Sequence, residues 1–163
     1  MAPDTATENL GVLLANERQE RLDAVAEVVR SAGHEVVAST LVADEVGALT
    51  RSARPDVAVV AVGPDPEHAL DQIEGIAADA VCPVIVLLGR SDPELVAEAA
   101  RRGAFGHALD TGPDELQSSI EIALRRFLEL RALESAFRRR ALVERAKGIL
   151  MERHGIDEQA AFG

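Results

Sequence analysis

Short apolar runs alternate with amphipathic stretches between Leu10 and Leu109, and this alternation constrains the fold more than any other feature. The runs Val57–Val62 and Pro83–Leu88 are apolar throughout, which is typical of strands buried on both faces. Each amphipathic stretch supplies the crossover that two parallel strands require. The sequence therefore predicts an α/β fold, a doubly wound five-stranded parallel sheet with helices on both faces. The expected strands are 10–15, 35–40, 57–62, 83–88 and 103–109, and the expected helices are 20–32, 41–53, 67–78 and 93–102, the last capped by Ser91.

The pattern changes at Pro113, which begins a stretch without Gly or Pro before Gly148. A helix from Pro113 to Arg138 would be about 39 Å long, more than one small sheet covers, so we expect it to pair with a second copy of the chain. An intramolecular helix bundle is the alternative. A short amphipathic helix, Ala141–Arg153, is expected to follow and to end at Gly155. The apolar residues of the long helix recur in alternating steps of four and three, the spacing of a coiled-coil seam: Leu116, Ile120, Ala123, Phe127 and Leu130.

Charge divides the chain in the same way. Residues 1–113 carry 19 acidic and 8 basic side chains, whereas residues 114–163 carry 9 of each. The net charge of −11 therefore comes from the first part alone. The first part should repel nucleic acid, so a polyanion would bind a basic cluster in the second part. The alternative is that this cluster is a solvated helix face. Its members are Arg138, Arg139, Arg140, Arg145, Lys147 and Arg153.

Composition excludes several classes of protein. Aromatic residues make up 2% of the chain, which disfavours folds that stack nucleic-acid bases on aromatic rings. No stretch reaches 18 apolar residues, so no membrane span is expected. The polar N-terminus does not resemble a signal peptide. Cys82 has no second cysteine to pair with, so a cytoplasmic protein is expected.

Two families share motifs with this chain. Residues 10–127 resemble a response-regulator receiver domain, and residues 141–162, A-L-V-E-R-A-K-G-I-L-M-E-R-H-G-I-D-E-Q-A-A-F, resemble the opening of an ANTAR domain, an RNA-binding antitermination module. The resemblance implies four parts: a flexible N-terminus (1–9), a receiver-like domain (10–112), a long helix or coiled coil (113–138) and a partial ANTAR domain (139–163). The sequence stops inside the expected second ANTAR helix, which implies either a truncated or a naturally short chain. The receiver motifs are V-L-L-A-N-E-R (12–18), A-G-H-E-V-V (32–37), R-P-D-V-A-V-V-A (54–61), C-P-V-I-V-L-L (82–88) and G-A-F-G-H-A-L-D (103–110).

The receiver resemblance also locates a phosphorylation pocket. An active receiver gathers two acids that hold Mg²⁺, an acceptor Asp, a Thr or Ser, and a Lys. These positions fall on Asn16 and Glu17, on Ala61, on Leu88 and on Asp110. The methyl group of Ala61 cannot form an acyl phosphate, and Asp110 would repel a phosphate. The resemblance therefore implies a pseudo-receiver with a degenerate pocket, no catalytic residue, no cofactor and no metal.

Other chemistry has weaker support in the sequence. Asp65 is the one alternative acceptor near Ala61, because Asp56 lies at the opposite end of that strand. Glu17 and Asp110 together could hold a cation, or they are two solvated acids. Cys82 is expected to be a small buried hydrophobe. The histidines show no metal-ligand spacing and are expected at the surface or at strand edges: His34, His68, His107 and His154.

The sequence thus predicts a non-enzymatic bacterial response regulator of the ANTAR type, allied to two-component signalling but independent of phosphorylation. It would act as a homodimer, bind a structured leader transcript and prevent termination of transcription, and its input would come from an unidentified signalling protein. The first alternative is a protein-interaction and dimerisation module with a truncated tail that no longer binds RNA. A flavodoxin-like enzyme is a distant third, and it would require a bound flavin or nucleotide.

Overall fold

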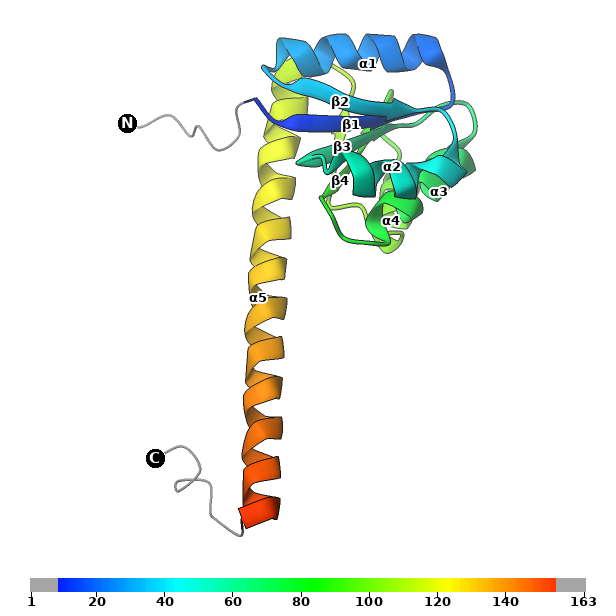
Figure 1. The fold of residues 1–163 in the computed structure, drawn as a ribbon. Coiled ribbons are helices and arrows are strands. Elements are labelled where there is room, and N and C mark those ends of the chain that lie inside the picture. Colours follow the sequence, from blue (N-terminus) through cyan, green and yellow to red (C-terminus); the bar gives the residue numbers. More distant parts are fainter. Residues whose placement is uncertain (1–8, 155–163) are drawn as a thin grey trace, which may run out of the picture. The chain divides into compact units, whose positions relative to one another are not determined.

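A five-stranded, all-parallel sheet forms the centre of the first of two compact units in the computed structural model, which describes residues 9–154 and their side chains up to residue 149. The strand order β2-β1-β3-β4-β5 confirms the doubly wound topology (Figure 1). The strands are β1 (Gly11–Ala15), β2 (Glu35–Thr40), β3 (Val57–Ala61), β4 (Val84–Leu88) and β5 (Gly106–Leu109). The helices are α1 (Gln19–Ser31), α2 (Val46–Ala53), α3 (Pro66–Ala77), α4 (Pro93–Arg101) and α5 (Pro113–His154).

Two apolar layers enclose the sheet because successive strand residues point to opposite faces. Every residue of β3 and of β4 is buried, as expected for central strands. One layer packs α1 and the first part of α5 against the sheet, and the other packs α2, α3 and α4 against the opposite face (Figure 1). Cys82 is buried in the second layer, and burial raises the pKa of its thiol to about 12, so this cysteine is a structural residue.

Local sequence explains where the helices begin. The carboxylate of Asp65 accepts a hydrogen bond from the backbone N–H of Glu67 (3.1 Å) at the start of α3. The carboxylate of Asp92, and not the expected Ser91, caps α4 by accepting from the N–H of Leu95 (3.1 Å). Asp92 takes this role because it directly precedes a proline in the first helical turn, which leaves Ser91 one position too early.

The expected helix 41–53 is divided in the structure. A 3-10 turn, η2 (Ala43–Glu45), precedes α2, which ends at a left-handed Arg54 (φ 48°). The tighter turn leaves Val42 exposed while Val46 is completely buried. The α-helix therefore starts later than the sequence predicts, because residues 43–45 form the 3-10 turn.

The helix α5 runs without a break from Pro113 to His154, so the expected long helix and the expected C-terminal helical segment are one element. Nothing between them interrupts the backbone hydrogen bonds, and Gly148 stays helical because a single glycine costs only about 1 kcal/mol. Among the described residues, no helix is both long enough and apolar enough to cross a membrane.

The structure corrects the predicted dimer seam. Leu116, Ile120 and Ala123 are fully buried and Phe127 is 6% exposed, all within the core of the first unit. The Phe127 ring packs edge-to-face on the ring of Phe105, with 5.3 Å between the centroids. These four residues therefore cannot form a seam between two chains. Of the five seam residues, only Leu130 is exposed, and it lies in the second unit, which begins at residue 128.

A buried histidine also ties α5 to the sheet. His34, expected at the surface or a strand edge, is 5% exposed just before β2. Its Nδ1 accepts a hydrogen bond from the N–H of Leu10 (3.1 Å), so its Nε2 carries the proton and donates to Oε1 of Gln117 on α5 (2.5 Å). The first turns of α5 are thus held by polar as well as apolar contacts.

Two phenylalanines on α5 provide a matched test of this division. Phe127→Ala should lower the free energy of unfolding by about 3 kcal/mol, because it empties a core site. Phe137→Ala should change the free energy of unfolding by less than about 0.5 kcal/mol, because the side chain of Phe137 is exposed to solvent. Urea unfolding followed by circular dichroism measures both values, and equal effects of the two substitutions would contradict the assignment of Phe127 to the core.

Candidate functional site

The five predicted pocket residues lie at one edge of the sheet, because the carboxyl ends of parallel strands meet there. Asn16 and Glu17 directly follow β1, and Asp110 directly follows β5. Ala61 is the last residue of β3 and Leu88 the last residue of β4, and both side chains are buried. The methyl and isobutyl groups of Ala61 and Leu88 offer no nucleophile and no hydroxyl, so neither can accept or sense a phosphoryl group.

Asn16 has a structural role that a carboxylate could not fill. Its side-chain Nδ2 donates to the carbonyl oxygen of Ala61 (2.6 Å), and its Oδ1 accepts from the N–H of Arg18 (2.9 Å). The Nε2 of Gln72 donates to the backbone carbonyl oxygen of Asn16 (3.0 Å). An ionised aspartate cannot donate a hydrogen bond, so the amide is what joins the ends of β1 and β3 here.

The carboxylate of Glu17 faces the loop after β3. Its Oε1 accepts a hydrogen bond from the backbone N–H of Asp65 (3.0 Å). A Cβ atom at Gly63 would collide with this carboxylate, so only glycine permits the close approach. Glu17 therefore positions the loop between β3 and α3.

The carboxylate of Asp110 has a different partner. Its Oδ2 lies 2.5 Å from Nη2 of Arg21, in an ion pair whose side chains are 19% and 31% exposed. The carboxylates of Glu17 and Asp110 thus bind different partners, the N–H of Asp65 and the guanidinium of Arg21, which argues against a cation that bridges them. Within the described part of the chain, no group of three or more His, Cys, Asp or Glu side chains is placed to hold a metal ion.

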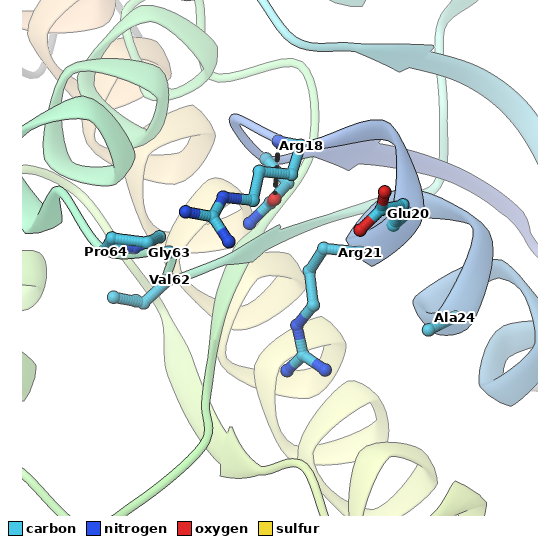
Figure 2. A pocket seen from close by; sticks show the side chains of 8 residues that line it. Arg18, Glu20, Arg21, Ala24, Val62, Gly63 and Pro64 are labelled. Carbon is cyan, nitrogen blue, oxygen red and sulfur yellow. Dashed lines mark hydrogen bonds between the residues drawn. The ribbon is translucent and has the colours of Figure 1, made fainter.

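A pocket of about 390 Å³ opens beside these residues (Figure 2). Figure 2 shows that Arg18 and Arg21, from the start of α1, extend their guanidinium groups along its wall. The wall carries the cations Arg18 and Arg21 beside one carboxylate, Glu20, and Arg21 is paired with Asp110. Sequence patterns predicted no role for either arginine, although Arg18 and Arg21 lie only one and four residues after Glu17. The lining residues are Asn16, Arg18, Glu20, Arg21, Ala24, Val62, Gly63 and Pro64.

Glu115 fixes the loop between β5 and α5. Its carboxylate accepts from the hydroxyl of Thr111 (2.6 Å) and from the N–H of Leu109 (3.1 Å). These two hydrogen bonds, that of Thr111 first, lower the pKa of Glu115. The loop that carries Asp110 is therefore held at α5 by Glu115 and at α1 by Arg21.

The alternative acceptors have other roles. The carboxylate of Asp65 caps α3, as described above. Asp56 lies at the amino edge of the sheet, where its Oδ2 accepts from the N–H of Gly11 (2.8 Å). The structure therefore brings no substitute acceptor to Ala61 from either position.

The predicted basic cluster lies on the exposed part of α5. Four of its members are exposed arginines, Lys147 is half-buried with its Nζ 3.5 Å from Oε1 of Glu144, and the side chain of Arg153 lies outside the described residues. Successive helix residues turn by about 100°, so these side chains do not share one face. The exposed arginines are Arg138, Arg139, Arg140 and Arg145.

A double-mutant cycle tests the ion pair at the carboxyl edge. Arg21→Ala and Asp110→Ala should show a coupling energy of about 1 kcal/mol at low salt, because the pair is partly buried. The more exposed pair Arg51–Asp79 (2.6 Å) is the control and should give about 0.3 kcal/mol. Urea unfolding of the variants measures both energies, and a coupling for Arg21–Asp110 no larger than the control would show that the pair does not hold this edge.

Known proteins match both parts of the chain. The ANTAR domain family matches residues 131–163. This match begins eight residues before residue 139, where the sequence motifs predict the start of the domain. The chain is similar to the transcriptional regulatory protein PdtaR of Mycobacterium tuberculosis, in strains CDC 1551 and H37Rv, with 31% identity over 167 residues that cover 98% of this chain and 81% of PdtaR.

Solved structures match the first unit. The signal receiver domain of a modulated diguanylate cyclase from Desulfovibrio desulfuricans G20 has a TM-score of 0.61 and 23% identity, covering 74% of this chain and 97% of that chain. The response regulator domain of Thermotoga maritima CheB has a TM-score of 0.61 and 18% identity, and the match covers 72% of this chain and 98% of that chain. These similarities show a receiver fold, and together with the PdtaR match they place the protein in the family of ANTAR-containing response regulators.

Proposed function

We propose that this protein is a non-enzymatic, phosphorylation-independent antitermination regulator that acts in the cytoplasm as a dimer and binds structured leader RNA through its C-terminal part. The observation that carries the proposal is the pocket chemistry. Ala61 stands at the acceptor position, and Asp110, at the position of the usual lysine, forms an ion pair with Arg21. The acceptor position is therefore neutral, and the position of the usual lysine carries the opposite charge.

The carboxyl edge supports a receiver that keeps one conformation without phosphate. In a phosphorylatable receiver, a lysine and a hydroxyl respond to the new phosphoryl charge. Here direct bonds join the same loops: Asn16 to β3, Glu17 to the loop before α3, and Arg21 to the loop after β5. The input in this proposal is contact with a signalling protein, since the acceptor position at this edge holds the methyl group of Ala61.

Charge supports RNA binding by the second unit. Residues 130–149 carry six basic and two acidic side chains, in contrast to the acidic receiver. Exposed arginines on a helix neutralise phosphates and release counterions, which makes such binding dependent on salt. The ANTAR match over residues 131–163 supports the proposal, because the resemblance to this family implies an RNA-binding module.

An exposed apolar row supports the dimer. Leu130, Leu133 and Phe137 stand at i, i+3 and i+7 on α5 and are 43%, 69% and 73% exposed. Three large apolar side chains on one helix face lose contact with water when a second helix covers them. This row replaces the buried residues Leu116 to Phe127 as the proposed contact between chains.

Treatment with Mg²⁺ and acetyl phosphate should leave the protein unmodified, because the acceptor position holds a methyl group. Intact-mass spectrometry measures the result, with a receiver that retains its acceptor aspartate as the positive control. A stoichiometric phosphoryl adduct that is lost when one acid, such as Asp65, is replaced would refute phosphorylation independence.

Charge reversal should separate the two units in RNA binding. Arg145→Glu with Lys147→Glu should weaken binding of a two-hairpin leader RNA by about tenfold or more and flatten its salt dependence. Arg90→Glu, a charge reversal on the receiver, should leave the affinity within about twofold. Filter binding at two salt concentrations measures both, and no binding by the unmodified chain would instead favour a protein-interaction module with an inactive tail.

A further inference from the structure

The pocket of Figure 2, here called the first hollow, lies where the strand order of the sheet reverses. From β1 the chain runs first to β2 and then returns to β3 on the other side of β1. In doubly wound folds, ligands bind at such a point, outside the carboxyl ends of the strands. Of the five positions of the phosphorylation pocket, only Asn16 lines the first hollow. The first hollow is therefore distinct from the degenerate phosphorylation pocket.

Arg18 supplies the first hollow with a cation that can bind a ligand. Its guanidinium group extends along the wall (Figure 2), and it forms no ion pair with any residue that the structure describes. The other arginine of the lining, Arg21, is already paired with Asp110 (2.5 Å). The acid of the lining, Glu20, opposes an anion, but Glu20 is exposed to solvent that screens its charge. The guanidinium of Arg18 therefore fits one compact anion, bound through two oxygens.

A second hollow, of about 430 Å³, shares residues 62–64 with the first. It lies between the loops that follow β3 and β4, where Pro66 and Leu88 add to its apolar lining. The exposed Arg90 lines it as well, and a guanidinium plane stacks on the face of an aromatic ring. The carboxylate of Asp92, also in the lining, is occupied as the cap of α4. The second hollow therefore fits a flat ring, in contrast to the first.

We propose that the two hollows together bind a mononucleotide, with its phosphate group on Arg18 and its base in the second hollow beside Arg90. A mononucleotide joins a compact anion to a flat ring, and each hollow lies within the range of about 300–1,000 Å³ that small-molecule sites occupy. The contact is noncovalent, so it requires no acceptor residue. The inference goes beyond the proposed function, because it gives the receiver a small-molecule ligand in addition to its partner protein.

Isothermal titration calorimetry of the full chain tests the site, with the four ribonucleoside 5′-monophosphates as probes. At least one of them should bind with a Kd below about 1 mM at about 50 mM NaCl. It should bind more tightly than its nucleoside or inorganic phosphate, because only the mononucleotide fills both hollows. Binding by none of the four would overturn the proposal. Inorganic phosphate that binds as tightly as every mononucleotide would also overturn it, because the ring would then contribute nothing.

Two arginines of α1 offer a matched pair of variants. Arg18→Ala should weaken mononucleotide binding by about tenfold or more, because it removes the cation that contacts the phosphate group. Arg30→Ala removes an exposed arginine from the other end of the same helix and should leave the Kd within about twofold. Glu20→Gln should tighten binding by about two- to fivefold, because it removes the opposing charge. Equal effects of Arg18→Ala and Arg30→Ala would contradict a site in the first hollow.

The basic part of α5 is the competing place for a phosphate group, and one variant separates the two. Arg145→Glu with Lys147→Glu should leave the Kd for the mononucleotide within about twofold, because both residues lie in the second unit. If this variant abolished mononucleotide binding while Arg18→Ala did not, the inference would fail and the proposed RNA contact would stand. Loss of mononucleotide binding in Arg18→Ala, with RNA binding unchanged, would support a ligand site in the receiver.

Discussion

The packing of the first turns of α5 against the sheet is the contact on which the rest of the structure depends. Leu116, Ile120 and Ala123 complete, together with residues of α1, the apolar layer that covers one face of β1, β3 and β4. Because Phe127 closes this layer against Phe105, the apolar residues that follow on the same helix remain accessible. One helix therefore supplies both the core of the receiver and an exposed surface of different chemistry.

The carboxyl edge of the sheet keeps the geometry of a receiver but not its charges, because Ala61 is neutral and Asp110 is acidic where a lysine is usual. The parallel fold places these five side chains at this edge whatever residues they are. The fold therefore sets where the site lies, and the residue types set its chemistry. Here an amide, a methyl group and an arginine–aspartate pair join loops that a metal and a phosphoryl group join in a phosphorylatable receiver. Regulation by contact between macromolecules, as proposed for α5, is consistent with an edge of this kind.

The alternation of apolar runs predicted the sheet and its doubly wound class, because each buried strand and each crossover leaves a local pattern, whereas the pocket positions came from the resemblance to receiver domains. The same reasoning misread the function of the α5 stripe. Steps of four and three describe a helix face that packs on a sheet as well as one that packs on another helix. Ser91 and Asp92 are both good helix caps, and only the backbone geometry decided between them. Arg21 was missed because its partner Asp110 lies far away in sequence.

The sequence by itself determined which chemistry is absent, since no fold can give Ala61 a carboxylate, and it determined where positive charge gathers along the chain. Only the tertiary structure decided which apolar residues of α5 are enclosed and which charges are neutralised. The physical reason is that burial and ion pairing are relations between distant segments. Whether Phe127 is core and Phe137 is surface depends on where the sheet ends beneath the helix, and no local pattern in the sequence records that limit.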